Sequence, residues 1–211
     1  MPPLRIAITN QKGGTGKTTL ALNLAAGLHQ RGSTVILDTD PQRSVSQWAS
    51  LNEGGDLPEV QHVQEESDLT EIFRGMQKHR YLVLDCPPTL QTQTVQKVLS
   101  NVDIALIPIQ PSPIDLWASI DIADEVHRSK KHNPRLKAFV VLNQLDARNS
   151  LSKSMHEALA EFDFPTLRTG IARRAAYRNA AMEGTSVYGL GPRGKSAVCE
   201  IESIIKELLK S

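Results

Sequence analysis

Cysteine and long apolar runs are both scarce in this chain of 211 residues. Its two cysteines, Cys86 and Cys199, exclude a disulfide framework and a C-x-x-C metal site. No run approaches the ~18 apolar residues of a membrane span, and the N-terminus lacks a basic-then-apolar signal segment. We therefore expect a globular protein of the reducing cytoplasm.

Net charge is also nearly absent, at +1, but the charges are unevenly placed. Residues 1–125 carry 9 basic and 15 acidic side chains, whereas residues 126–211 carry 15 and 8. This asymmetry permits a basic face built from the C-terminal part. The length suits one α/β domain, and no low-complexity linker or repeat divides the chain, so we expect a single domain over residues 1–211.

A glycine-rich stretch at residues 10–19 (NQKGGTGKTT) organises the chain. It follows an apolar run at residues 4–8, which predicts a buried strand, and it opens a helical pattern at residues 20–29. Glycines here let backbone N–H groups converge on an anion, and the helix N-terminus adds a positive dipole end. Lys17 would reach the phosphates and the Thr18 hydroxyl would bind Mg²⁺. The alternative, a tight turn with a chance Gly-Lys-Thr, is disfavoured by the flanking strand and helix.

The loop departs from the standard pattern G-x-x-x-x-G-K-[ST], because Gln11 replaces the first glycine and a second lysine, Lys12, stands inside it. This resembles the deviant Walker A box of the ParA/MinD family of ATPases. In that family the extra lysine reaches across a dimer interface, which implies that Lys12 acts in trans and that ATP joins two protomers. The alternative is a solvated loop lysine. The resemblance assigns nucleotide binding to Gly13, Gly14, Thr15, Gly16, Lys17, Thr18 and Thr19.

Two acidic boxes follow, at residues 38–42 (DTDPQ) and at the end of the apolar run 81–85, which Cys-Pro-Pro follows. Carboxylates at the ends of parallel strands lie at the ligand-binding edge of the sheet. The boxes resemble the family's D-x-D-P-Q motif and its Walker B strand with a D-x-P-P switch. That resemblance implies that Lys12, Lys17 and Asp40 are catalytic. Asp40 would act on the attacking water. The resemblance places Asp38 and Asp85, with Thr18, on the Mg²⁺ side. An Asp-rich turn and a plain strand end are the alternatives.

The remaining pattern alternates strands and helices, which predicts an α/β fold with a mostly parallel, twisted sheet and helices on both faces, of the P-loop NTPase type. We expect helices at 44–51, 67–78 with Ser67 as cap, 89–100, 116–128, from Ser150 or Ser152 to 161, and 195–209. Further strands are expected at 34–37, 103–109, 138–142 and 165–167, with a loop at 52–58 and a basic loop at 130–137.

Three later segments add to the resemblance. Residues 110–115 (QPSPID) are similar to a loop of the small stand-alone ParA proteins of the ParF type. Residues 169–184 resemble the family's adenine-proximal segment, and a polar residue ends the strand at 138–142. The resemblance therefore implies that Asn143, Ile171 and Arg173 lie at the adenine.

The function that these resemblances imply is a partition or cargo-positioning ATPase with ATP and Mg²⁺ as cofactors. ATP would join two copies into a homodimer, the dimer would bind non-specific DNA of the nucleoid, and a ParB-like or cargo-adaptor protein would stimulate hydrolysis. The cargo would be a plasmid, a chromosome origin or a protein organelle such as a carboxysome. The candidate DNA contacts are Arg168, Arg173, Arg174, Arg178, Arg193 and Lys195.

Two other classes remain open. A MinD-like regulator would bind membrane through the amphipathic helix at 195–209, but Glu200, Glu202 and Glu207 deprive it of a basic excess, so we expect it to dock on the sheet. A metabolic P-loop enzyme, such as a dethiobiotin synthetase-like ligase, is the third class. Because the first strand begins within a few residues of Met1, we expect no DNA-reading domain before it and no operator recognition by this chain alone.

Overall fold

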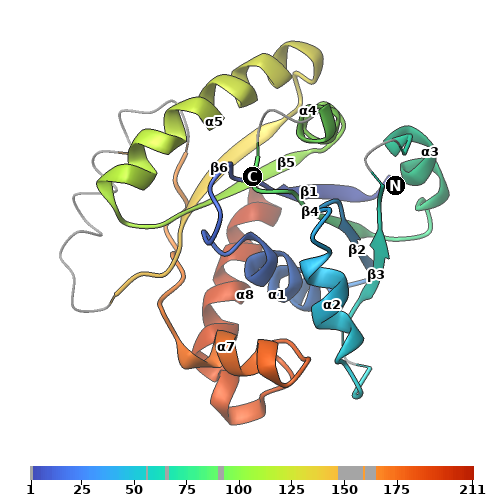
Figure 1. The fold of residues 1–211 in the computed structure, drawn as a ribbon. Coiled ribbons are helices and arrows are strands. Elements are labelled where there is room, and N and C mark those ends of the chain that lie inside the picture. The colour runs from blue at the N-terminus through green and yellow to red at the C-terminus, as the bar shows by residue number, and fades with distance from the viewer. Residues whose placement is uncertain (1, 56, 65–66, 90–92, 147–158, 160–164) are drawn as a thin grey trace.

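One parallel sheet forms the centre of the molecule. The computed structural model describes residues 2–55, 57–64, 67–89, 93–146, 159 and 165–211. Within them six strands are ordered β3-β2-β4-β1-β5-β6, and every neighbouring pair is parallel (Figure 1). The predicted α/β class with a mostly parallel sheet is confirmed. The strands are β1 (Leu4–Ile8), β2 (Thr34–Asp38), β3 (Glu59–His62), β4 (Tyr81–Asp85), β5 (Ile104–Ile109) and β6 (Lys137–Leu142).

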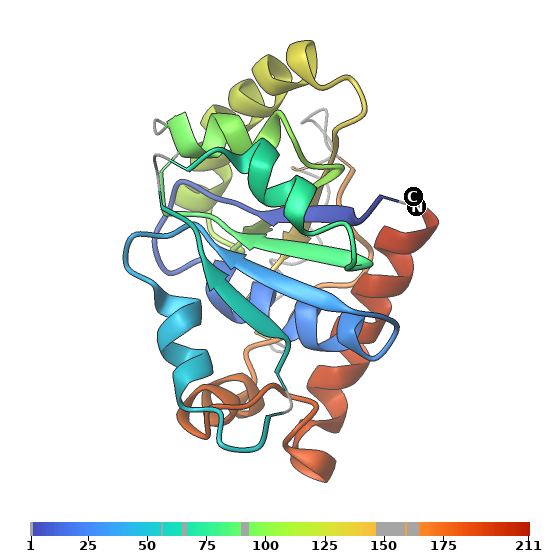
Figure 2. The ribbon, with the colours of Figure 1, turned by 90° about the vertical axis from the view of Figure 1, so that its right-hand side faces the viewer.

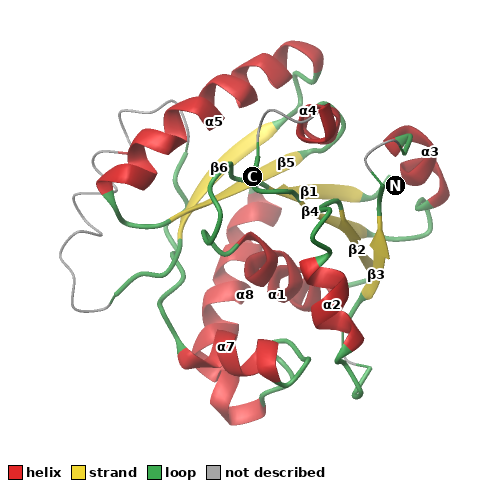
Figure 3. Ribbon diagram, viewed as in Figure 1, coloured by secondary structure: helices red, strands yellow, loops and turns green. Residues whose placement is uncertain are grey.

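Helices cover both faces of this sheet, as expected of parallel strands joined by crossovers. Figures 1 and 2 show the two layers, and Figure 3 sets the strands apart from the helices around them. One layer contains α1 (Lys17–His29), α2 (Ser44–Ser50), α7 (Ala175–Met182), the 3-10 turn η1 (Gly191–Gly194) and α8 (Lys195–Lys210). The opposite layer contains α3 (Leu69–Gly75), α4 (Gln93–Leu99) and α5 (Pro113–His132).

The strand residues alternate between these two layers, which is why the strands read as continuous apolar runs. In β1, Ile6 and Ile8 join the cluster on the α1 side, whereas Ala7 joins the cluster on the α5 side. All three are fully buried. A strand covered on both faces has no polar face to show in the sequence.

Helix α1 is buried on nearly all sides, whereas the sequence suggested one apolar face. It lies between the sheet and α8, and the two helices approach closely at Gly27, where an added Cβ would lie 2.6 Å from Ile205 Cδ1. The expectation that residues 195–209 dock on the protein's own sheet is confirmed as to docking, with Ile201, Ile204 and Ile205 fully buried, but not as to the surface. Helix α8 packs chiefly against α1 rather than directly on the sheet.

The direction of the chain through the sheet places the loops of interest at one edge. From β1 the chain crosses to β2 on one side, and from β4 it crosses over β1 to β5 on the other. The carboxyl ends of β1 and β4 therefore flank the point where the winding reverses, which is the usual ligand crevice of an open α/β sheet. The glycine-rich loop leaves β1 there, and Asp85 ends β4.

Several predicted boundaries are wrong. Strand β3 was missed, because its sequence, EVQH, is polar and it lies at the sheet edge. Helix α3 is capped by Asp68, which accepts a hydrogen bond from Thr70 N, rather than by Ser67, and it ends at Gly75. Helix α5 continues through the basic run to His132.

Two further predicted elements are not found as a strand or helix among the described residues. Residues 165–167 form an isolated bridge between Thr166 and Val140 rather than a strand. The helix predicted from Ser150 or Ser152 to 161 lies outside the described residues, as does the stretch 90–92 before α4.

Candidate nucleotide site

The loop between β1 and α1 has the winding of an anion-binding turn. Gly14 and Gly16 have φ angles of 76° and 89°, in the left-handed region that favours glycine. Gly16 is also the residue before α1, and an added Cβ there would lie 2.3 Å from Asn143 Nδ2. Because no side chain caps α1, its first N–H groups are available to an anionic ligand.

Side chains from two other strand ends bind the carbonyl groups of this loop. Gly14 O accepts hydrogen bonds from Gln110 Nε2 at 2.7 Å and from Gln144 Nε2 at 2.9 Å. Thr15 O accepts one from Asn143 Nδ2 at 2.6 Å. These bonds fix the loop from the side of β5 and β6 and occupy partial negative charges that would otherwise oppose a phosphate. Neither glutamine is among the predicted site residues, although Gln110 begins the loop at residues 110–115.

Lys17 lies buried under the loop, with its Nζ donating to Lys12 O at 3.1 Å. Burial lowers the pKa of Lys17, and the nearby carboxylates of Asp85 and Asp40 oppose that shift. A buried ammonium beside a glycine-rich turn is well placed for charge-assisted hydrogen bonds to phosphate oxygens. The predicted contact of Lys17 with the phosphates stays a prediction.

Lys12 is held by its own chain rather than free in solvent. Its Nζ lies 2.9 Å from Asp115 Oδ1, and the Asp115 side chain is 3% exposed. Asp115 also bonds the hydroxyl of Ser112, the N-cap of α5. A charge pair with one buried partner is not a plain solvated lysine, so the loop lysine has a specific environment. Asp115 was not among the predicted site residues, although its loop was.

Thr18, Asp85 and Asp38 converge on one side of the loop. Thr18 Oγ1 donates to Asp85 Oδ2 at 2.8 Å, and Asp38 lies directly opposite Asp85 in the β2–β4 register. Burial raises the pKa of Asp85 to about 7, and the charge of Asp38 adds to the shift. Asp85 Oδ1 is buried without a hydrogen-bond partner.

These groups fit a hard cation that takes oxygen ligands. Mg²⁺ is bound through one or two protein oxygens together with water and substrate phosphates, so it does not require a cage of side chains. Among the described residues, no group of three or more His, Cys, Asp or Glu side chains forms such a cage. The orphaned oxygen of Asp85 and the Thr18 hydroxyl are the two groups best suited to this ion.

Asp38 and Asp40 shape the loop that follows β2. Asp38 accepts from Asp40 N at 3.2 Å, from Ser46 N at 2.9 Å and from Ser46 Oγ at 2.6 Å. Asp40 accepts from Gln42 N at 2.9 Å and is buried. Both carboxylates thus fix the loop near Lys17. Their roles in the Mg²⁺ shell and in water activation stay predictions.

Cys86, next to Asp85, is fully buried, and burial raises the pKa of its thiol to about 12. The thiol is therefore protonated and unreactive at neutral pH.

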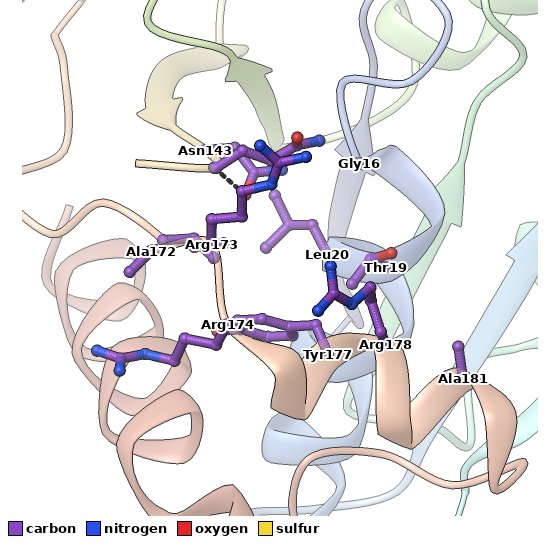
Figure 4. A pocket seen from close by; sticks show the side chains of 12 residues that line it. Gly16, Thr19, Leu20, Asn143, Ala172, Arg173, Arg174, Tyr177, Arg178 and Ala181 are labelled. Carbon is purple, nitrogen blue, oxygen red and sulfur yellow. Dashed lines mark hydrogen bonds between the residues drawn. The ribbon is translucent and has the colours of Figure 1, made fainter. Parts of the chain in front are cut away.

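A cavity of about 290 Å³ opens beside the loop (Figure 4). The predicted residues Gly16, Thr19, Asn143, Ile171 and Arg173 all line it, so the structure brings the expected phosphate and adenine groups together. Both ends of the Asn143 amide are used within the chain, because Oδ1 accepts from Gln144 N at 2.8 Å. Base recognition by Asn143 stays a prediction. The other lining residues are Leu20, Gln144, Ala172, Arg174, Tyr177, Arg178 and Ala181.

The candidate DNA contacts do not form one group. In Figure 4, Arg173 and Arg178 extend toward the cavity, whereas Arg174 extends away from it toward α8, where it pairs with Glu200 at 2.7 Å. Arg193 makes two bonds to Glu183, at 2.7 and 2.9 Å. Lys195 begins α8, and exposed Arg168 lies at the far end of that helix, with its N–H bonded to Glu207.

None of the described helices combines the length and the apolar character needed to cross a bilayer. The apolar face of α8 is occupied inside the molecule, with Ile201, Ile204, Ile205 and Leu208 all buried.

Comparison with known proteins gives a consistent answer. Residues 6–187 match the profile of the CobQ/CobB/MinD/ParA nucleotide binding domain. The chain is 39% identical to the maintenance of carboxysome distribution protein A of Halothiobacillus neapolitanus, over 98% of this chain and 96% of that one. It is 29% identical to the chromosome partitioning protein ParA of Caulobacter vibrioides, over 94% of this chain and 92% of the other.

Solved structures share the fold. A putative plasmid partition protein of Borrelia burgdorferi bound to AMPPNP superposes with a TM-score of 0.77 at 20% identity, covering 99% of both chains. The MinD cell division protein of Aquifex aeolicus gives a TM-score of 0.75 at 16% identity, covering 99% of this chain and 97% of that one.

Proposed function

Because this chain belongs to the CobQ/CobB/MinD/ParA family of nucleotide-binding domains, we propose that it is an ATPase that positions a cargo inside the cell. Its relatives include proteins named for carboxysome distribution and for chromosome partitioning. The nucleotide is ATP with Mg²⁺, and the reaction converts ATP and water to ADP and phosphate. Residues 1–211 act as one ATPase domain.

The observation that carries this proposal is the second lysine of the glycine-rich loop. Lys17 alone satisfies the phosphate site of an ordinary P-loop enzyme, whereas Lys12 is an additional cation at the rim, held by Asp115. Its 39% exposed side chain can leave that pair and reach outward. A second copy that faces this edge of the sheet would then offer its own nucleotide to Lys12.

The chemistry at the site is positioning and charge neutralisation. Lys17 and the N–H groups at the start of α1 would hold the phosphates, and Asp40 would orient the attacking water. Mg²⁺ would be held from the Thr18 hydroxyl and the carboxylate of Asp85, with Asp38 beside it, and would neutralise phosphate charge. Dependence on Lys12 makes hydrolysis a property of the dimer.

The proposed dimer would bind DNA through phosphates, without sequence preference. Of the six predicted DNA contacts, Arg174 and Arg193 are engaged by glutamates, which leaves exposed Arg168, Arg173, Arg178 and Lys195. An adaptor protein on the cargo would stimulate hydrolysis and release the dimer. This cycle places the protein in the cytoplasm, on the nucleoid.

A MinD-like membrane regulator is the second candidate, and the burial of the α8 apolar face disfavours it. A ligase of the same fold would need turnover of a small-molecule acceptor. Liposome sedimentation and assays with candidate acceptors distinguish both from the proposed function.

The experiment that tests the proposal is the substitution Lys12→Ala. We expect it to leave ATP binding largely intact, because Lys17 and the loop N–H groups remain, and to abolish ATP-dependent dimerisation and DNA binding. Light scattering with ATP and Mg²⁺ measures the dimer, and co-sedimentation measures DNA binding. Lys97→Ala, a change in α4 on the other layer, is the matched control. Unchanged dimerisation of Lys12→Ala would refute the trans role.

A further inference from the structure

The second half of the segment at residues 166–177 forms one wall of the cavity beside the loop, through Ile171, Ala172, Arg173, Arg174 and Tyr177. Strand β6 holds one side of this segment. Ile171 N donates to Leu142 O at 2.8 Å, and Arg173 N donates to Leu145 O at 2.8 Å. These bonds continue the direction of the sheet past the end of β6. They fix the position of the segment relative to β6, but they do not hold the side of the segment that faces away from β6.

Helix α8 holds that side through Glu200. The Glu200 carboxylate accepts from Arg174 Nε at 2.8 Å, lies 2.7 Å from Arg174 Nη2 and accepts from Tyr177 Oη at 3.0 Å. Ala172 N donates to it at 3.4 Å. The hydrogen bond to Glu200 raises the pKa of Arg174. One carboxylate therefore gathers three residues of the wall, and its side chain is only 13% exposed.

A second glutamate, two turns later in α8, binds the start of the same segment. Glu207 accepts from Arg168 N at 2.8 Å and from Thr169 N at 3.0 Å. Two consecutive backbone N–H groups on one carboxylate orient the chain as a cap does at a helix start. Sequence alone presents both glutamates as part of a solvated polar face.

Helix α8 is in turn fixed to the helix that starts at the phosphate loop. Ile201 and Ile205 are buried against α1, and Arg31 at the end of α1 pairs with Glu202. Through α8 and α1, the wall segment is therefore connected to the glycine-rich loop, so the two sides of the cavity are held relative to one another.

We propose that Glu200 and Glu207 are positioning residues for the nucleotide base. They set the distance of Ile171 and Arg173 from the phosphate loop, and so the fit of a purine between them. This inference rests on the proposed function, because it takes the cavity as the base site of ATP. Neither glutamate touches the nucleotide, and neither takes part in the chemistry.

The test separates the two ends of the ligand. Dissociation constants for ATP and for inorganic tripolyphosphate, both with Mg²⁺, are measured by calorimetry on the full chain and on Glu200→Gln with Glu207→Gln combined. Removal of hydrogen bonds to two charged acceptors should weaken ATP binding about tenfold. Tripolyphosphate, which reaches only the glycine-rich loop, should bind within about twofold of its original affinity.

Two further variants guard the interpretation. Lys206→Gln is the matched control, because Lys206 lies in the same helix and is exposed; it should leave both affinities unchanged. Arg174→Met removes the Glu200 pair from the other side without touching α8, and should reproduce a smaller loss for ATP alone, about threefold.

The outcomes are distinguishable. Equal losses for ATP and tripolyphosphate, or no loss for either, would refute the positioning role while the ATPase proposal stands. An unmodified chain that binds tripolyphosphate but not ATP would refute both.

Discussion

At the scale of single residues, Asp85 at the end of β4 has a strongly shifted pKa. Asp85 is fully buried beside Asp38, and burial raises its pKa to about 7. The folded state therefore keeps a proton that the unfolded state, with a pKa of 3.8, has already lost. Stability of the ligand-free protein must fall as pH rises from about 4 to about 7, and no further fall from this group occurs above that range.

The substitution Asp85→Asn tests this directly. Asparagine is neutral at every pH, so the pH-dependent loss due to this site should disappear. Relative to the original chain, the variant should gain of the order of 2–4 kcal/mol in unfolding free energy between pH 4.5 and pH 7.5. Urea titrations at the two pH values measure the difference. A constant difference between variant and original chain would show that Asp85 titrates normally.

The residue scale is also where the sequence was most informative. Lys17, Thr18 and Asp85 come together because each is tied to a strand end, and parallel strands bring their ends to one edge. Asp115, Gln110 and Gln144 were missed. Gln110 and Gln144 each donate one hydrogen bond to Gly14 O, and Asp115 pairs with Lys12. These contacts join residues far apart in the sequence, and local periodicity does not mark them.

At the scale of elements, the packing of α8 on α1 depends on a small residue. An added Cβ at Gly27 would lie 2.2 Å from Tyr188 Oη and 2.6 Å from Ile205 Cδ1. The helices can approach this closely because glycine presents only backbone at the crossing. The same contact brings Glu200 and Glu207 to the wall of the cavity.

Gly27→Val should therefore destabilise the fold by about 1–3 kcal/mol, because the added methyl groups overpack the crossing. It should also weaken ATP binding, since α8 moves with its glutamates. Thermal unfolding and calorimetry measure the two effects. Gly75→Ala is the control, because a Cβ at that position meets nothing within 4 Å; its stability should change by less than about 1 kcal/mol. Equal changes in stability and ATP affinity for Gly27→Val and Gly75→Ala would mean that the contact between α1 and α8 does not require a glycine.

Element boundaries explain most of the remaining errors of prediction. Helix α5 continues into its basic run because Lys130, Lys131 and His132 lie in its last turn, where cations favour the helix dipole. The run was expected to be a loop. Strand β3 has polar residues because it is an edge strand, paired on one side within the described sheet. Both cases depend on tertiary position, which local pattern does not carry.

At the scale of the whole molecule, the excess of basic residues in the C-terminal part favours DNA binding only where the side chains are not already paired with carboxylates. Arg178 is exposed at the mouth of the cavity, whereas Arg193 is bound by Glu183 through both of its terminal nitrogens. A guanidinium already held by a carboxylate releases fewer DNA counterions. Position in the C-terminal half alone does not make a residue part of a DNA-binding face.

Arg178→Ala should weaken non-specific DNA binding with ATP and Mg²⁺, and Arg193→Ala should weaken it less. If each protomer contributes one phosphate contact, the slope of log affinity against log salt should become shallower by about 2 for the dimer of Arg178→Ala. Fluorescence anisotropy on random-sequence duplex at several salt concentrations measures the slope. A larger effect of Arg193→Ala would move the DNA surface toward η1.

The pair between Lys12 and Asp115 has a last consequence for how such a molecule behaves among its copies. On the proposed function, Lys12 of each nucleotide-free protomer stays paired with Asp115 of the same chain. When two nucleotide-free copies collide, neither offers a nucleotide for the other's Lys12 to bind, so no dimer forms at any protein concentration. ATP binding, rather than collision between protomers, starts the cycle, and the nucleotide-free protomers stay inactive without a separate inhibitor.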